Sequence, residues 1–125
     1  NHRFGLYDAM MIKDNHIVAA GGLEKALAAA RGAAGHLVKI EIEVDSLAGL
    51  EEALAAGAQV VLLDNMSVND MKKAVALNKG RAVLEASGNV TLATVRAIAE
   101  TGVDVISSGW ITHSAPNLDL GLDFL

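Results

Sequence analysis

Residues 38–64 read VKIEIEVDSLAGLEEALAAGAQVVLLD, and this stretch contains one complete repeat of the pattern that runs through the chain. It begins with Val38–Val44, in which apolar and charged residues alternate, and it ends with the mostly apolar run Val60–Asp64. Between them, Leu47–Ala56 carries leucines at positions 47, 50 and 54, which share one face of a helix. A continuously apolar strand is typical of a parallel sheet that is covered on both faces. The stretch therefore predicts a β–α–β unit.

The same alternation continues on both sides of this unit. We predict five strands, over residues Met10–Lys13, Val38–Val44, Val60–Asp64, Ala82–Glu85 and Val103–Ser107. We predict four main helices, over Leu23–Ala34, Leu47–Ala56, Val68–Asn78 and Leu92–Glu100. Ser67 and Thr91 directly precede the last two predicted helices, at the N-cap position where a side-chain oxygen accepts a hydrogen bond from the first turn. Gly57, Gly80 and Gly102 follow three of the helices, where a left-handed residue ends a helix at low cost.

The spacing of the strand ends indicates a barrel. Glu43, Asp64 and Glu85 stand 21 residues apart, and Ser107 follows 22 residues later. Such a steady period predicts an α/β fold in which parallel βα units form part of an incomplete TIM-like α/β barrel, with five strands and four to five helices. A doubly wound open sheet is the alternative, although no GxGxxG follows the first strand.

Five strands do not close an ordinary eight-stranded barrel. The chain also starts at Asn1 rather than at a methionine. We therefore expect residues 1–125 to be part of a longer protein, whose first barrel strands precede Asn1.

Composition excludes several classes of function. Hydrophobic residues make up 52% of the 125 residues, and the net charge is −5 with no basic cluster, which argues against nucleic acid or an anionic membrane as a partner. No apolar run reaches the roughly 18 residues that a membrane span needs. The chain has no cysteine, which excludes disulfides, cysteine–zinc sites and a thiol nucleophile. We expect a cytoplasmic location.

Polar groups gather at the predicted carboxyl ends of the strands, where barrel enzymes place their active sites. If the Val/Ile face of Val38–Val44 packs on helices, then Lys39, Glu41 and Glu43 point into the barrel, where buried charges need a cation or a ligand. The alternative is an edge strand with one face in water. The matching positions of Asp64 and Glu85 favour a functional site.

Two loops after the last strands suit a phosphate, because small residues let backbone N–H groups approach an anion. They are Ser87-Gly88-Asn89 and Ser108–Ser114, which includes Gly109 and His113. The alternative is that Gly88 and Gly109 only make tight turns. Trp110 lies either in the core or at a pocket rim.

Basic residues stand near the first predicted strand. His2, Arg3 and Lys13 form a set that suits a small di-acid, because Arg grips carboxylates with two hydrogen bonds and Lys acts as a point charge. We interpret His16 and His36 as structural or solvent-exposed.

Seven motifs, in order, make the chain resemble the quinolinate phosphoribosyltransferases. They are Asn1-His2-Arg3-x-Gly5-Leu6-x-Asp8, Ile12-Lys13-Asp14-Asn15-His16, Glu41-Ile42-Glu43-Val44, Leu63-Asp64-Asn65, Glu85-Ala86-Ser87-Gly88-Asn89-Val90, Thr101-Gly102-Val103-Asp104 and Thr112-His113-Ser114. The resemblance runs from the first residue to Leu118-Asp119-Leu120.

The resemblance implies phosphoribosyl transfer from phosphoribosyl pyrophosphate (PRPP) to quinolinate, with Mg²⁺ and decarboxylation. The products are nicotinate mononucleotide, pyrophosphate and CO2, on the way to NAD. By match, His2, Arg3 and Lys13 hold quinolinate, while Glu43 and Asp64 serve the ribose and the magnesium–pyrophosphate. By the same match, the phosphate is surrounded by Ser87, Gly88, Asn89, Ser108, Gly109 and His113. The family is that of the type II phosphoribosyltransferases, so the resemblance implies that residues 1–125 are the C-terminal barrel portion and that an N-terminal domain is absent from this sequence. It also implies a homodimer or a higher homo-oligomer of the full-length protein.

Three other interpretations stay open. A molybdenum-transport-associated paralogue of the same fold shares the His-Arg motif but differs over the stretch Ile12–His16, which favours quinolinate here. Nicotinate phosphoribosyltransferase is a second enzymatic alternative. A non-catalytic, phosphate-binding half-barrel is a third. The family's upstream glycine run and its arginine–lysine–threonine element are absent, so we expect the isolated chain to be inactive and to expose apolar barrel edges.

Overall fold

The computed structural model describes residues 4–118 and 120–122. Its strands are β1 (Ala9–Ile12), β2 (Lys39–Val44), β3 (Val60–Asp64), β4 (Val83–Ser87) and β5 (Val105–Ile106). Its helices are α1 (Asp14–Ala20), α2 (Leu23–Ala33), α3 (Leu47–Ala55), α4 (Val68–Asn78), α5 (Val95–Ala99) and α6 (Trp110–His113). The five predicted strands and the four main predicted helices are thereby confirmed, with shifts at their ends.

The strands form one sheet in the order β1-β2-β3-β4-β5, and every neighbouring pair is parallel. A doubly wound sheet reverses its strand order at a switch point, and none occurs here. The doubly wound alternative is therefore wrong. Sequential parallel strands, each pair joined by a helical connection, form part of a TIM-like barrel.

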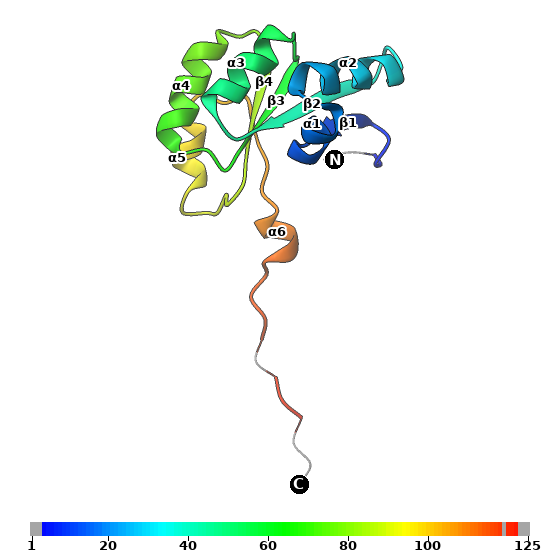
Figure 1. The fold of residues 1–125 in the computed structure, drawn as a ribbon. Helices are drawn as coiled ribbons and strands as arrows, with labels where there is room; N and C mark the ends of the chain where they lie inside the picture. Colours follow the sequence, from blue (N-terminus) through cyan, green and yellow to red (C-terminus); the bar gives the residue numbers. More distant parts are fainter. Residues whose placement is uncertain (1–3, 119, 123–125) are drawn as a thin grey trace.

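The alternation in β2 sets which face of the sheet the helices cover. Ile42 is fully buried and Val44 nearly so, whereas Glu41 and Glu43 stay partly exposed on the opposite face. The register pairs Ile42 with Val61 and Glu43 with Leu62, so the same division continues into β3. Figure 1 shows α3 and α4 side by side over the sheet. The apolar strand residues and the inner faces of these helices form the core.

Helix ends agree in part with the sequence signals. Ser67 caps α4, because its Oγ accepts a hydrogen bond from the Asp70 N–H at 3.1 Å, as predicted. The prediction for Thr91 is wrong: α5 begins at Val95, four residues later, and Thr94 occupies its N-cap. The Thr94 Oγ1 instead accepts from the Thr91 N–H at 2.9 Å, which makes a separate turn before the helix. The predicted helix Leu92–Glu100 is correspondingly shorter.

Two short helices, α1 and α6, were not predicted, so the described chain has six helices rather than four or five. Neither contains a fully buried residue, which explains why no apolar period marks them. The start of α1 is held by His16, whose Nδ1 accepts from the Lys13 N–H at 2.9 Å. Gly21, with φ at 78°, ends this helix in the left-handed region. The structural, solvent-exposed role expected of His16 is confirmed.

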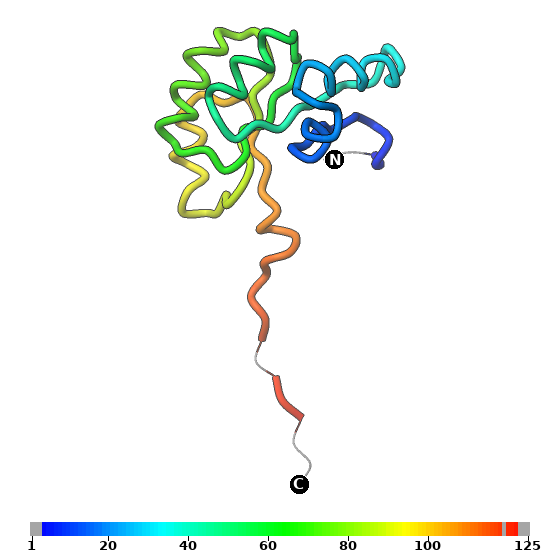
Figure 2. Tube along the Cα trace, viewed as in Figure 1, coloured from blue at the N-terminus to red at the C-terminus, as the bar shows by residue number. Residues whose placement is uncertain are grey.

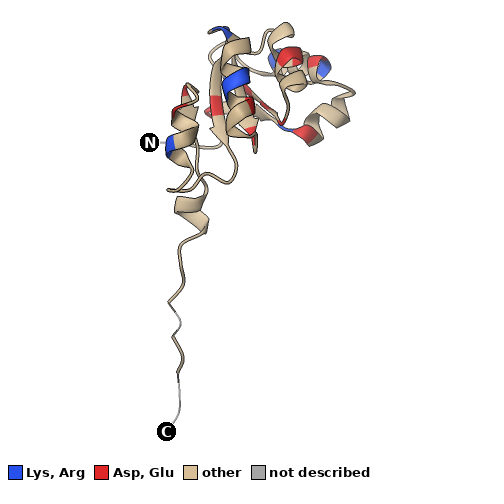
Figure 3. Cartoon of the chain, turned by 90° about the vertical axis from the view of Figure 1, so that its left-hand side faces the viewer, with Lys and Arg blue, Asp and Glu red and all other residues tan. Residues whose placement is uncertain are grey.

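The described residues after α6 extend away from the body, as Figures 1 and 2 show. In Figure 3 the segments coloured for Lys, Arg, Asp and Glu lie in the body, and the described part of this tail contains none of these residues. Within the described residues, no helix combines the length and the apolar character that crossing a bilayer requires.

A core substitution tests the placement of β3. Leu63 is fully buried, whereas Leu37 is 84% exposed. We expect Leu63→Ala to lower the free energy of unfolding by about 2–5 kcal/mol, because the truncation leaves a cavity. The same change at Leu37 should alter it by less than about 0.5 kcal/mol. Urea unfolding followed by circular dichroism measures both. Equal effects at the two positions would contradict the burial of β3.

Candidate functional site

A cavity of about 360 Å³ lies at the carboxyl edge of β3, β4 and β5. It is lined by Asp64, Ser87, Gly88, Asn89, Val90, Thr91, Ser107, Ser108, Gly109, Trp110, His113 and Ser114. All six residues predicted to surround a phosphate are among them. The structure therefore brings together two loops that are about 20 residues apart in the sequence.

Backbone geometry explains the glycine in the first loop. Gly88 has φ at 88°, and a Cβ at this position would clash with the side-chain amide of Asn65. The next residue, Asn89, also lies in the left-handed region, with φ at 52°. Gly88 does make a tight turn, and the turn also forms one wall of the cavity.

The glycine of the second loop has a different role. Gly109 has φ at −72°, a value that any residue adopts, so the tight-turn interpretation does not hold there. A Cβ at position 109 would instead lie 2.5 Å from His113 Nε2. The absence of a side chain lets the imidazole lie against the backbone of the loop.

Polar groups around the cavity are partly engaged with one another. The Ser108 Oγ donates to the Val90 carbonyl at 2.7 Å, which ties the two loops together. The Ser114 Oγ lies 2.9 Å from His113 Nδ1. Trp110 lines the cavity and is 40% exposed, so the pocket-rim interpretation is right. No Lys or Arg occurs among the described lining residues, which leaves backbone N–H groups, hydroxyls and the imidazole as donors to an anion.

A second cavity, of about 310 Å³, adjoins the first and is strongly acidic. Glu43 and Asp64 both line it, and Asp64 lines the first cavity as well, so this carboxylate stands between the two. The remaining carboxylates in its lining are Asp14, Asp45 and Glu52. The Lys13 Nζ lies 3.5 Å from Glu43 Oε2 and places one cation beside this acidic wall.

The carboxylates at this edge do not form a protein-only metal site. Within the described residues, no three His, Cys, Asp or Glu side chains are arranged to hold a metal ion. Mg²⁺ commonly takes one or two carboxylates from the protein and completes its shell with water and substrate phosphates. Glu43 and Asp64 fit that pattern, in which the ion arrives with its phosphates.

Farther down the same face of the sheet, Glu41 is poorly partnered. Its Oε1 is buried without a hydrogen-bond partner among the described residues. Burial raises the pKa of Glu41 to about 7, helped by the charge of Glu85, a hydrogen bond with Glu85 and the charge of Glu43. Glu85 itself accepts a hydrogen bond from the Ser107 Oγ. The charges predicted to point into the barrel therefore do lie on the face that the helices leave open.

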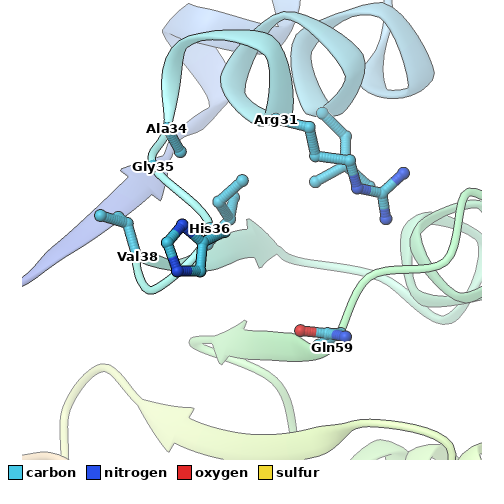
Figure 4. A pocket seen from close by; sticks show the side chains of 8 residues that line it. Arg31, Ala34, Gly35, His36, Val38 and Gln59 are labelled. Carbon is cyan, nitrogen blue, oxygen red and sulfur yellow. The ribbon is translucent and has the colours of Figure 1, made fainter.

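A cavity at the opposite edge of the sheet is structural. It measures about 210 Å³ and lies where β2 and β3 begin, near Arg31, His36 and Gln59 (Figure 4). The Arg31 guanidinium donates to the carbonyls of Ala56 and Gly57, at 3.0 and 2.6 Å, and so holds the end of α3. In barrels this face contributes to stability rather than to chemistry. His36 is solvent-exposed, as expected.

Two of the predicted site residues, His2 and Arg3, lie outside the described residues. Thr91, Ser107 and Ser114 also line the first cavity, although none of them was among the residues predicted to surround the phosphate. Ser114 belongs to the second predicted loop, and Thr91 and Ser107 stand close to the two loops in the sequence, which was the only available signal. Asn65 belongs to the Leu63-Asp64-Asn65 motif, but its contact with Gly88 depends on the pairing of β3 with β4.

The chain is similar to known proteins over most of its length. The family described as "Quinolinate phosphoribosyl transferase, C-terminal domain" matches residues 1–123. A probable nicotinate-nucleotide pyrophosphorylase [carboxylating] of Bacillus subtilis is 47% identical over 98% of this chain and 43% of its own length. The human nicotinate-nucleotide pyrophosphorylase [carboxylating] is 42% identical over 98% of this chain and 42% of its own length.

A solved structure shows the same fold. The nicotinate-nucleotide pyrophosphorylase from Francisella tularensis superimposes with a TM-score of 0.84 and 47% identity, over 90% of this chain and 40% of that one. The chain thus spans less than half the length of the curated relatives it matches.

Substitution of Gly88 tests the first loop. We expect Gly80→Ala to cost about 1–2 kcal/mol of stability, because φ is 73° there and the space around it is open. Gly88→Ala should cost at least about 1 kcal/mol more, because its Cβ also meets Asn65. Thermal unfolding of the two variants and the parent gives the comparison. Equal costs would mean that Gly88 serves only the turn.

The raised pKa of Glu41 predicts a pH dependence of stability. The folded protein keeps a proton on Glu41 up to about pH 7, while the unfolded chain loses it near 4.5. The folded state binds more protons in this window, so its stability should fall as the pH rises through it. We expect Glu41→Gln to flatten that fall, measured by urea unfolding at pH 5 and pH 8. Glu51→Gln, on the exposed face of α3, should leave the slope unchanged.

Proposed function

Because this chain belongs to the quinolinate phosphoribosyl transferase C-terminal domain family, we propose that the protein containing it transfers a phosphoribosyl group from PRPP to quinolinate. The names of its relatives in Bacillus subtilis and human support this proposal. The products are nicotinate mononucleotide, pyrophosphate and CO2, so the protein is a pentosyltransferase of NAD biosynthesis. The activity belongs to the longer protein, and the isolated 125 residues are expected to be inactive.

One observation carries the proposal: the two predicted phosphate loops and Asp64 line a single cavity at the carboxyl edge of the sheet. In TIM-like barrels this edge carries the active site, and the loops after the last strands hold a phosphate. The phosphate of PRPP, and afterwards that of the product, would accept hydrogen bonds from the side chains of Ser87, Asn89 and His113 and from the loop backbone. Because the Ser108 hydroxyl donates to the Val90 carbonyl, Ser108 would contribute through its backbone N–H. Gly88 and Gly109 keep the approach free of side chains.

The reaction forms a bond between the pyridine nitrogen of quinolinate and the anomeric carbon of the ribose. The bond from that carbon to pyrophosphate breaks, and pyrophosphate leaves with the electron pair. Positive charge develops on the ribose, and the carboxylates of Glu43 and Asp64 would favour it electrostatically. Both line the acidic cavity, and Asp64 lies between it and the phosphate cavity. The carboxylate next to the ring nitrogen then leaves as CO2, and a proton takes its place on the ring carbon.

Quinolinate carries two carboxylates and needs cations to hold it. Lys13 lies beside Glu43 at 3.5 Å, and its side chain is 53% exposed, so it is accessible to a second anion. In this position the Lys13 ammonium would contact Glu43 on one side and a carboxylate of quinolinate on the other, and so would help to orient the substrate. His2 and Arg3 would complete the set, with Arg gripping one carboxylate through two hydrogen bonds.

Magnesium, when bound with PRPP, would supply charge neutralisation for the leaving pyrophosphate. Glu43 and Asp64 would hold it from the protein side, in keeping with a site that offers two carboxylates rather than three. We further propose a cytoplasmic location and a homodimer or a higher homo-oligomer for the full-length protein.

The alternatives predict different outcomes. The stretch Ile12–His16 favours quinolinate over the substrate of a molybdenum-transport-associated paralogue, and the relatives named above support the same choice. A nicotinate phosphoribosyltransferase would need to bind only one carboxylate of its substrate, so loss of Lys13 should weaken quinolinate and nicotinate binding equally. A non-catalytic half-barrel would bind phosphate without turnover.

The decisive assay uses the full-length protein with Mg²⁺, PRPP and quinolinate labelled in the carboxyl group that departs. We expect labelled CO2 from the parent. Lys13→Ala should lower kcat/KM for quinolinate by about 10- to 100-fold, since a charged contact contributes about 1.5–3 kcal/mol. Lys72→Ala, which removes an exposed lysine of α4, is the matched control and should retain the parent rate. A folded parent that releases no CO2 would contradict the proposed function.

A further inference from the structure

Asn65 connects the Asp64 carboxylate to the Ser87–Asn89 loop through its side chain. Its Nδ2 donates to Asp64 Oδ2 at 3.0 Å, and its Oδ1 accepts from the Asn89 Nδ2 at 2.8 Å. Asn89 belongs to the loop that lines the first cavity, and Asp64 lines both cavities. One amide therefore joins the end of β3 to the loop after β4.

The direction of these hydrogen bonds follows from chemistry. An ionised carboxylate only accepts, so the group of Asn65 that faces Asp64 must be its NH₂. The carbonyl of Asn65 then faces Asn89, which has to donate through its own NH₂. No other arrangement satisfies all three side chains at once.

The backbone of Asn65 strengthens the same connection. Its N–H donates to the Ser87 carbonyl at 3.0 Å, directly beyond the pair formed by Asp64 and Ser87 at the end of the sheet. Its φ is 52°, a left-handed value that Asn adopts more readily than other residues with a side chain. Gly88 packs directly against the amide and leaves no room for a Cβ.

Asn65 does not itself line either cavity at this edge. Asn65 contacts Asp64 and Asn89, which line the cavities, and it would not contact the ligand itself. Its two side-chain hydrogen bonds are exposed, and such bonds contribute little to global stability. Loss of the amide should therefore change how Asp64 is held more than whether the protein folds.

We propose that Asn65 is a positioning residue, which holds the Asp64 carboxylate in a fixed orientation relative to the Ser87–Asn89 phosphate loop. This inference rests on the proposed function. Under this proposal, the side chain of Asn65 aligns the Asp64 carboxylate, which would face the ribose, with the Ser87–Asn89 loop, which would hold the phosphate. Misalignment by about 1 Å is enough to slow a reaction that depends on orientation about a hundredfold.

Asn65→Asp in the full-length protein is the sharpest test. The replacement is isosteric and tolerates the left-handed backbone, and it keeps an acceptor for Asn89. It removes the donor to Asp64 and sets a second negative charge beside it. We expect kcat to fall about 10- to 100-fold, with KM for quinolinate unchanged within about twofold and the melting temperature close to that of the parent. Asn69→Asp, the same change at an exposed position of α4, should leave all three unchanged.

Asn65→Gly separates lost positioning from added charge. Glycine keeps the left-handed backbone and removes both side-chain hydrogen bonds without a new carboxylate. A loss of kcat in both variants supports the proposal. A parent-like kcat in Asn65→Gly, or a fall in melting temperature together with a changed KM for quinolinate in both variants, would overturn it. An inactive parent would instead refute the proposed function, which keeps the two failures distinct.

Discussion

Burial of one face of β2 is the constraint on which the other features depend. Side chains alternate along a strand, so placing Ile42 and Val44 against the helices turns Glu41 and Glu43 to the other face. A slip of one residue would bury the carboxylates among apolar helices, at a cost of several kcal/mol per charge. The register is therefore strongly specified. This register places Glu43 beside Leu62 of β3, and it places Leu62 beside Glu85 of β4.

Position along the same face then divides the carboxylates into two kinds. Glu43, near the end of its strand, has Lys13 at 3.5 Å and a cavity in front of it. Glu41, two residues deeper, has an oxygen that is buried without a partner, and its pKa rises to about 7. An unsatisfied buried polar group costs about 1–3 kcal/mol, and taking up a proton relieves part of that cost. At the edge of the sheet, a carboxylate can thus lie near a cation and line an open cavity.

The loops at that edge depend on residues that tolerate a left-handed backbone. Asn65, Gly88 and Asn89 all have positive φ, and each stands just after a strand. Gly88 and Asn89 line the cavity directly, whereas the Asn65 N–H still continues the sheet by donating to the Ser87 carbonyl. Asn65 and Gly88 also pack on one another, which couples the turn after β3 to the turn after β4. The loop after β5 completes the lining of the cavity, which therefore comes from three strand ends.

Sequence periodicity was sufficient to predict the five parallel strands, the main helices and the two loops, because burial leaves a period of two or 3.6 in the residues themselves. It also placed Asp64 and the six loop residues at one edge, since parallel strands end together. It did not reveal α1 and α6, which bury no residue completely and so leave no period. Nor did it distinguish the glycine of a turn, Gly88, from the glycine that makes room for an imidazole, Gly109. The role of Gly109 depends on the turn of α6, which brings His113 back against it. The role of Gly88 and the contact of Asn65 with Asn89 depend on which strands become neighbours, because only the folded chain brings residues 24 positions apart within hydrogen-bonding distance.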